Sequence, residues 1–383
     1  MNPKKKGILI LTPFFSPNIG GVETHLNDLV TALDKKGYRI FVQTYSPITT
    51  KNTKWKKREF GGNFIQITRY RWFGENLFHK LENYPILDFL YLTPYLLIRS
   101  FFFMLSNARN IDVIHAQGLN AGMIGVILKT IFQKRFLISL HAIYSNIDCD
   151  GLSSLMARAI INRADVTLGM SKSVNNQFDQ TGIKLRNIEK YRYWVNLNLF
   201  KPSNLKESRN KVGIDDRFTV LFVGRLIPVK GIKLLVKIAQ ELDQIQFVFI
   251  GGGPLEFFLK DVSDQNSNIK FLGQVQNIHL PYYYSSADIF CIPSQYEEGL
   301  GRVVMESVAC GTPVVGSNRG GISEALSETV SILVKPTHNN LKNAIKMLYI
   351  DNEKLKTLKN NCRDYAIMNY SEKNLDLVTR HYD

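Results

Sequence analysis

Short apolar runs alternate with amphipathic stretches along the whole chain, and this alternation is the feature that most limits the fold. The apolar runs are short, as buried strands are, and the stretches between them carry apolar residues at helical spacing, for example Ile232, Leu235 and Ile238. We predict strands at residues 7–11, 40–44, 112–115, 136–140, 166–170, 219–223, 246–250, 269–272, 289–292 and 313–315. Strand–helix alternation of this kind predicts a parallel sheet with helices on both faces.

The alternation stops near residues 199–205 and then starts again. Each series is long enough to build one sheet, and a chain of 383 residues suits two domains better than one. We therefore predict an α/β chain with two Rossmann-like, doubly wound domains, residues 1–200 and residues 201–383, facing each other across a cleft. Helical patterns at 355–370 and 372–381 follow the last strand, and we expect the last helix to pack back on the first domain.

The composition is that of a globular protein, with 45% hydrophobic and 21% charged residues. The four cysteines have no paired spacing, which argues against a disulfide framework or a zinc site and favours reduced thiols. The first apolar run is broken by Thr12 and Pro13, which is too early for the core of a secretion signal. We therefore expect a cytoplasmic protein.

The formal net charge is +15, which favours anionic partners such as phosphorylated ligands or acidic lipids. A nucleic acid would fit the charge equally well. The sequence has no zinc-finger, RNP or helix-turn-helix motif, however, so we do not expect a nucleic-acid partner.

A pair of glycines follows the first predicted strand, at the sheet edge where open parallel sheets bind ligands. Gly20 and Gly21 precede a predicted helix at 22–36 and would let backbone amides approach a phosphate closely. A plain glycine turn is the alternative. The segment lacks the G-x-G-x-x-G pattern, so a nicotinamide cofactor is unsupported.

Two cations follow the first strand of the second series. Arg225 comes directly after Gly224, and Lys230 lies where the next helix begins. Cations beside a helix start suit a diphosphate, which needs its charge neutralised; solvated surface cations are the alternative. The next strand ends in three glycines, including Gly252, which indicate a close backbone approach or an extreme turn.

Residues 293–306, after the strand at 289–292, carry the richest pattern. Gly299, Leu300 and Gly301 lead into an apolar helix whose first amides are free to bind phosphate. Glu298 is placed on the loop and Glu306 in the early turns of the helix, so a carboxylate on each side could accept hydrogen bonds from sugar hydroxyls. The alternative interpretation is that neither binds a ligand, and that one is simply a glutamate at a helix start and the other an exposed glutamate.

Together these residues resemble the retaining glycosyltransferases of family 4, which have the GT-B fold. The resemblance covers essentially the whole chain, from Gly20 and Gly21 through the E-x7-E pair and residues 309–315 to G-G-I-S-E at 320–324. It implies transfer of a hexosyl or N-acetylhexosaminyl group from a nucleoside diphosphate sugar. The sequence departs from the usual motifs of the family at residues 193–196, at Ser323 and at residues 336–338.

The resemblance also assigns roles to residues. Arg225 and Lys230 would bind the donor diphosphate, Glu298 and the amides after it the donor sugar, and Glu306 the nucleotide ribose. His141 would be the active-site histidine facing the donor sugar. His115, on an adjacent strand end, is a weaker candidate for that role.

Asp148 and Asp150 have the D-x-D spacing by which a different transferase fold holds a metal. That fold has one domain, and the motif here lies within the first of two series, so coincidental loop acids explain it better. We expect no metal requirement and no cofactor, because the nucleotide sugar is a substrate and the charge on its diphosphate is met by cations and amides.

Residues 85–105 are unusually apolar, and Lys54, Lys56, Lys57 and Arg58 lie shortly before them. Asp88, Pro94 and Arg99 argue against a membrane-spanning helix. A buried helix pair and a face that docks on an anionic membrane both remain open. The docking hypothesis places the protein at the inner face of the cell membrane, with a lipid-linked saccharide or glycan as acceptor.

The alternatives for function are a nucleotide-sugar epimerase and a non-catalytic scaffold that binds sugar or a protein.

Overall fold

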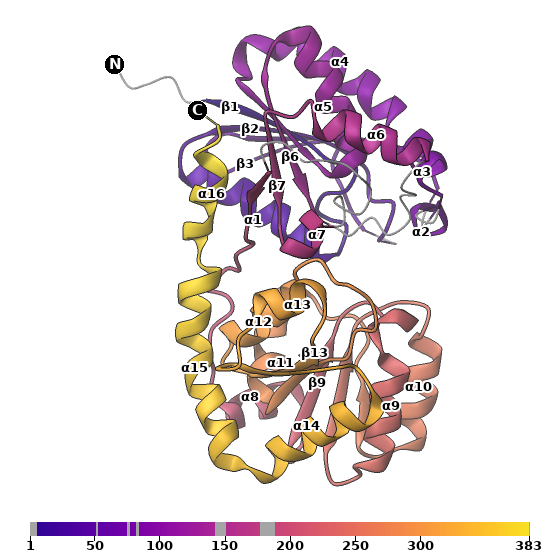
Figure 1. Cartoon of the computed structure of the whole chain (residues 1–383), viewed down its shortest axis with the longest axis vertical. Helices are drawn as coiled ribbons and strands as arrows, with labels where there is room; N and C mark the ends of the chain where they lie inside the picture. Colours follow the sequence, from indigo (N-terminus) through magenta and orange to yellow (C-terminus); the bar gives the residue numbers. More distant parts are fainter. Residues whose placement is uncertain are drawn as a thin grey trace. The chain divides into compact units, whose positions relative to one another are not determined.

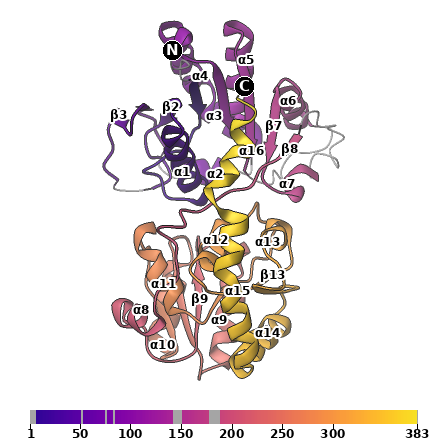
Figure 2. The same cartoon turned by 90° about the vertical axis from the view of Figure 1, so that its left-hand side faces the viewer.

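The structure is a computed structural model that describes residues 6–50, 53–74, 77–81, 84–141, 151–176 and 188–382. It divides into two compact units (Figure 1 and Figure 2). Unit 1 is Met1–Tyr193 together with Lys373–Asp383, and unit 2 is Trp194–Glu372. The chain therefore passes from unit 1 to unit 2 and returns.

The boundary between the units differs from the predicted one at residues 200 and 201. The segment at 194–200 packs against α15 (Asn352–Tyr370) within unit 2. The amide of Val195 donates to the Tyr370 carbonyl at 3.1 Å, and the Arg363 guanidinium donates to the Phe200 carbonyl at 2.8 Å. These hydrogen bonds tie the segment to the second unit, whereas the last residues belong to the first.

Unit 1 is built on an eight-stranded sheet in the order β3-β4-β2-β1-β5-β6-β7-β8. All neighbouring pairs are parallel except β3 and β4, which are antiparallel. The central strands β1 and β5 are buried along their whole length, so they form the core. The strands are β1 (Gly7–Leu11), β2 (Arg39–Tyr45), β3 (Arg58–Gly61), β4 (Ile65–Tyr70), β5 (Val113–Gln117), β6 (Arg135–Leu140), β7 (Val166–Gly169) and β8 (Ile188–Lys190).

Helices cover both faces of this sheet, as the doubly wound prediction requires. Figure 1 shows α4, α5 and α6 on one face and α1 and α16 on the other. The helices of unit 1 are α1 (Gly21–Lys35), α2 (Leu77–Leu81), α3 (Pro85–Leu92), α4 (Pro94–Asn107), α5 (Gly118–Phe132), α6 (Leu152–Ile161), α7 (Lys172–Asn176) and α16 (Asp376–Thr379).

Unit 2 contains a six-stranded parallel sheet in the order β11-β10-β9-β12-β13-β14. Its strands are β9 (Thr219–Val223), β10 (Gln246–Ile250), β11 (Ile269–Phe271), β12 (Ile289–Ile292), β13 (Val314–Ser317) and β14 (Ser331–Val334). Its helices are α8 (Leu205–Val212), α9 (Ile232–Glu241), α10 (Glu256–Gln265), α11 (Leu280–Ser286), α12 (Arg302–Ala309), α13 (Gly320–Ala325), α14 (His338–Ile350) and α15.

In each unit the first strand in the chain lies at the middle of the sheet, and the order of connections reverses beside it. In unit 2, β9 is followed outward by β10 and β11 on one side and by β12, β13 and β14 on the other. In unit 1, the same reversal falls between β1 and β5. Open sheets of this order bind ligands outside the carboxyl ends of the strands at this reversal point. The loops that follow the strands at these two reversal points are therefore the candidate ligand sites.

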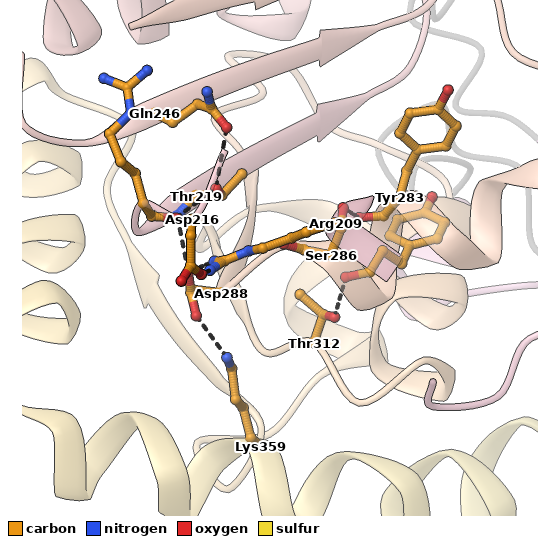
Figure 3. Close-up of polar contacts among 11 residues, drawn as sticks. Arg209, Asp216, Thr219, Gln246, Tyr283, Ser286, Asp288, Thr312 and Lys359 are labelled. Carbon is orange, nitrogen blue, oxygen red and sulfur yellow. Dashed lines mark hydrogen bonds and ion pairs between the residues drawn. The ribbon is translucent and has the colours of Figure 1, made fainter. Parts of the chain in front are cut away.

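The opposite edge of the unit 2 sheet is held by a buried charge network (Figure 3). Arg209 of α8 donates to the Asp288 carboxylate at 2.7 Å, and Lys359 of α15 donates to the same carboxylate at 2.9 Å. Asp288 also accepts the amide of Thr219, the first residue of β9, at 2.9 Å. Because these groups lie where β9 and β12 begin, the network is structural and leaves the carboxyl ends of the strands open.

Candidate functional site

Two loops of unit 2 meet at the reversal point between β9 and β12. The first carries the short 3-10 helix Pro228–Lys230, and the second begins with Pro293 after β12. The amide of Gln295 donates to the Val229 carbonyl at 2.8 Å, which joins the two loops. Gly231 has a φ of 73°, and a Cβ there would lie 2.1 Å from the Pro293 carbonyl oxygen. Glycine is therefore required for the loops to come this close.

The joined loops bring together Lys230 and Glu298. The Lys230 Nζ lies 2.6 Å and 2.7 Å from the two Glu298 carboxylate oxygens, and the Ser294 hydroxyl donates to one of them. Both side chains are largely buried, with exposed fractions of 13% and 7%. Burial alone would lower the pKa of Lys230, but the Glu298 carboxylate and Tyr296 together outweigh it, so the pKa is raised. The lysine is thus a fixed cation at the end of the sheet.

The Glu298 loop is held from behind by the glycine pair at the start of α13. The Gly321 amide donates to the Glu298 carbonyl at 2.8 Å, and a Cβ on Gly321 would lie 1.4 Å from the Gly299 carbonyl oxygen. The G-G-I-S-E segment of the sequence therefore acts through packing that sets the position of Glu298.

The helix α12 begins one residue after Gly301, close to the predicted position. Gly301 has a φ of 68°, in the left-handed region that favours glycine, and no side chain of the described residues caps the helix there. The amides at 300–302 therefore stay the predicted phosphate contacts. Gly299 and Leu300 precede them on the same loop.

Glu306 lies inside α12, and its carboxylate is 3% exposed. It accepts from Arg302 Nε at 2.9 Å and from the Tyr284 hydroxyl at 3.1 Å. Burial raises the pKa of Tyr284 well above its usual value, and the Glu306 carboxylate adds to the shift. The ribose contact expected of Glu306 stays a prediction. Arg302 and Tyr284 were not predicted, although the i, i+4 spacing of Arg302 and Glu306 is a signal for this pair.

Arg225 and the predicted glycines lie at the carboxyl ends of β9 and β10. Arg225 is exposed, and the amide of Gly224 donates to the Ile250 carbonyl at 3.0 Å. Leu226 donates its amide to the Gly252 carbonyl at 2.9 Å. The loops after β9 and β10 are thus bonded to each other, and Arg225 projects from this pair of loops beside the reversal point.

The reversal point of unit 1 is occupied by a histidine cluster. His141 follows β6, and its Nε2 lies 2.7 Å from Oε1 of Gln117, the last residue of β5. The Tyr193 hydroxyl lies 2.5 Å from Nδ1 of His141, and the Tyr193 ring stacks on His25 of α1 at 3.7 Å. With the amide oxygen of Gln117 as acceptor, Nε2 carries the proton and Nδ1 accepts from Tyr193.

Burial lowers the pKa of His141 to about 3, so the imidazole is neutral near pH 7. Gln117, Tyr193 and His25 were not predicted from sequence. Gln117 could have been found, because strand alternation puts it on the same side of β5 as His115. Gly20 and Gly21 lie at the start of α1, as predicted, and Gly20 is its N-cap.

His115 does not join this cluster through a hydrogen bond. Its Nδ1 lies 2.9 Å from the Tyr382 hydroxyl and its Nε2 lies 2.7 Å from the Ser139 hydroxyl. Burial, with a smaller contribution from His141, lowers the pKa of His115 to about 3. The side chain is wholly buried, which fits a structural role.

The D-x-D residues Asp148 and Asp150 lie outside the described residues. Among the residues that the structure describes, no group of three or more His, Cys, Asp or Glu side chains is placed to hold a metal ion. Cys291, Cys310 and Cys362 are free and buried.

Family models match both parts of the chain. The model of the Glycosyl transferases group 1 matches residues 204–365, and that of Glycosyltransferase Family 4 matches residues 19–190. The Uncharacterized glycosyltransferase MJ1607 of Methanocaldococcus jannaschii is 30% identical over 242 residues, which are 57% of this chain and 61% of that protein. The chain thus matches less than two thirds of this relative.

Solved structures share the fold over nearly the whole chain. The sucrose-phosphate synthase of Thermosynechococcus elongatus superposes with a TM-score of 0.80 at 23% identity and covers 98% of both chains. The Anabaena protein Alr3699/HepE, in complex with UDP and glucose, gives 0.76 at 21% identity, with the same coverage. The expected architecture, two Rossmann-like domains of the GT-B type, is thereby confirmed.

Proposed function

Because the chain belongs to the Glycosyl transferases group 1, with a family 4 first half, we propose that it transfers a sugar from a nucleoside diphosphate sugar to a hydroxyl acceptor. The observation that carries the proposal is the Lys230–Glu298 pair at the reversal point of the unit 2 sheet. A fixed cation and a fixed carboxylate next to a helix start suit a diphosphate and a sugar, respectively. The UDP and glucose bound to the Anabaena neighbour are ligands of this kind.

In the proposed mechanism, the barrier falls through charge stabilisation of the departing diphosphate. Lys230, Arg225 and the amides at 300–302 would supply positive charge without a metal ion. Glu298 would accept hydrogen bonds from the sugar hydroxyls and orient the ring. His141 would face the donor sugar as a neutral group, because burial lowers its pKa.

We further propose that the transferred group is a hexosyl or N-acetylhexosaminyl unit and that its anomeric configuration is retained. The acceptor would be a lipid-linked saccharide or a glycan, used in the cytoplasm at the inner face of the cell membrane. The high charge of the chain and the apolar residues at 85–105 support a membrane-bound acceptor. A nucleotide-sugar epimerase and a non-catalytic scaffold are the alternatives that the experiment must exclude.

The test begins with a thermal-shift screen of the purified protein against nucleoside diphosphate sugars. We expect one base and one sugar to raise the melting temperature more than the free diphosphate does, because sugar and phosphates both make contacts. Turnover of that donor with a hydroxyl acceptor is then followed by proton NMR of the product's anomeric signal. Retention supports the proposal, while inversion refutes the stereochemical part. Binding without release of nucleoside diphosphate favours the scaffold, and interconversion of the free nucleotide sugar favours the epimerase.

A further inference from the structure

Helices α3 and α4 of unit 1 carry large apolar side chains that are 44–61% exposed. On α4, the exposed fractions of Ile98, Phe102 and Leu105 are 53%, 61% and 58%. Their spacing of four and three residues aligns them in one stripe along the helix. The other side of α4 is buried through Leu96 and Met104. The helix α3 adds three more exposed apolar side chains, those of Ile86, Leu87 and Leu90.

The stripe lies on a helix that is held along the sheet. By length and composition, Pro85–Asn110 could span a membrane, and 33% of an 18-residue apolar window within it is buried. The structure breaks it into two helices at Thr93, and α4 packs on strand aromatics through Tyr95 and Phe103. A helix fixed to a sheet in this way can lie on a bilayer with one face, but it cannot cross the bilayer without losing this packing.

An open groove of about 410 Å³ lies beside α4 on the same face of the sheet. Phe41, Phe60 and Phe64 line it, and Phe41 contacts Phe103 of α4, which fixes the groove next to the helix. Phe60 is 71% exposed. The apolar surface therefore continues from α4 onto β3 and β4.

The charge of the chain is concentrated in the same unit. Unit 1 contains 28 of the 48 Lys and Arg residues and 15 of the 33 Asp and Glu residues, so it carries +13 of the net +15. The exposed cations Lys54, Lys56, Lys57 and Arg58 come immediately before β3 or begin it, next to the groove. Exposed apolar side chains bordered by cations match the headgroup region of an anionic bilayer. A second copy of so basic a unit would be repelled.

We propose that α3, α4 and β3 form a docking surface for an anionic lipid bilayer. Ile98, Phe102 and Leu105 enter the boundary between headgroups and acyl chains, and the cations before β3 contact lipid phosphates. The attraction between these cations and anionic lipid gives reversible binding that salt weakens. The proposal is independent of the transferase chemistry, because no residue of the docking surface belongs to the candidate site.

The experiment compares sedimentation with vesicles of phosphatidylcholine alone and of phosphatidylcholine with phosphatidylglycerol. We expect wild type to bind the anionic vesicles, to leave them in high salt and to ignore the neutral ones. A triple variant, Ile98→Ser, Phe102→Ser and Leu105→Ser, should bind at least tenfold more weakly, since about tenfold is expected from one such side chain. The matched control replaces Phe257, Ile350 and Met368 by Ser, because these unit 2 side chains are 88%, 71% and 80% exposed. The control should bind like wild type.

A second readout places the stripe in the lipid. Beyond the signal of the three native tryptophans in wild type, Phe102→Trp should add a blue-shifted emission and quenching by brominated lipid in anionic vesicles, whereas Phe257→Trp should add neither. Equal binding to neutral and anionic vesicles, full binding by the stripe variant, or an unquenched Trp at position 102 would each overturn the proposal. So would a stable dimer of wild type that the stripe variant abolishes. Thermal shifts with nucleotide sugar, measured on the same variants, report separately on the donor site and on folding.

Discussion

The Lys230–Glu298 pair makes a quantitative prediction for Glu298→Gln. Lys230 is almost buried, and Glu298 is the carboxylate that neutralises it. Removing one partner of a buried ion pair costs about 3–5 kcal/mol, because the other charge stays buried. Gln keeps one oxygen that can accept from Lys230, so we expect the lower figure of about 3 kcal/mol. For a domain of this size, that corresponds to a melting temperature lower by roughly 6–12 °C.

A diphosphate bound to Lys230 should reverse this loss. Its charge would lie about 5 Å from the carboxylate, since the Nζ–O distance is 2.6 Å and a second hydrogen bond adds a similar length. At an effective dielectric constant of about 20, the repulsion is about 3 kcal/mol before solvent reduces it. Loss of the carboxylate should therefore strengthen binding of the nucleoside diphosphate by at least about tenfold. Turnover of the nucleotide sugar should still fall by about 10²–10³-fold, because the sugar hydroxyls lose a charged carboxylate acceptor.

Calorimetry of nucleoside diphosphate binding, and thermal melting with and without the diphosphate of the donor found in the screen, check both effects. Glu297→Gln is the matched control, because this neighbouring carboxylate is exposed and should change neither quantity. Asp288→Asn is the second control, since it breaks a buried ion pair at the far edge of the sheet. It should lower the melting temperature and leave nucleoside diphosphate binding as in wild type. If Glu298→Gln melts at the wild-type temperature and binds the nucleoside diphosphate no more tightly, the pair is not coupled to the donor site.

Three further predictions concern catalysis, metal and pH. Lys230→Ala or Arg225→Ala should lower kcat/KM for the nucleotide sugar by about 10²–10³-fold in a steady-state assay; wild-type rates in both would show that the diphosphate binds elsewhere. Transfer should persist in excess EDTA; abolition with rescue by manganese would point instead to Asp148 and Asp150. Burial lowers the pKa values of His115 and His141 from 6.5 to about 3. Between pH 6.5 and pH 3, these two histidines therefore bind protons only in the unfolded chain. The free energy of unfolding should fall as the pH drops through this range. Urea unfolding at pH 7 and pH 5 should show about 2 kcal/mol lost per histidine, and His115→Gln should remove its share whereas the exposed His279→Gln should not.

Most strands predicted from sequence are short runs in which apolar residues predominate. Thr219–Val223 and Gln246–Ile250 are buried at every position, as parallel strands covered on both faces are, and their predicted bounds match. The strand β4 was missed because Gln66 and Thr68 interrupt its apolar residues. The strand β3 was missed because its four residues are all exposed at the sheet edge. Edge strands of this kind have no hydrophobic pattern to detect.

The site residues were predictable one by one, but their pairing was not. Lys230 and Glu298 each follow a strand, and that position identified them. They are 68 residues apart in the chain, so only the strand order could bring them together. The partners of His141 and Glu306, which are Tyr193 and Tyr284, come from other elements and carry no motif. Sequence patterns therefore do not identify the residues that only hold a site side chain in position.

The core of unit 1 depends on a residue that follows the whole of unit 2 in the chain. Tyr382 is 1% exposed, and its hydroxyl meets His115 at 2.9 Å. During synthesis, the buried position of Tyr382 beside His115 therefore stays empty until residues 194–372 have been made and the last residues follow them. A fragment that ends at Tyr193 would lack this side chain however well its own strands pair. The Lys6 ammonium donates to the Tyr382 carbonyl at 3.1 Å, so a short linker could carry residues 373–382 directly to residue 6. Such a permuted gene would supply unit 1 as one continuous piece.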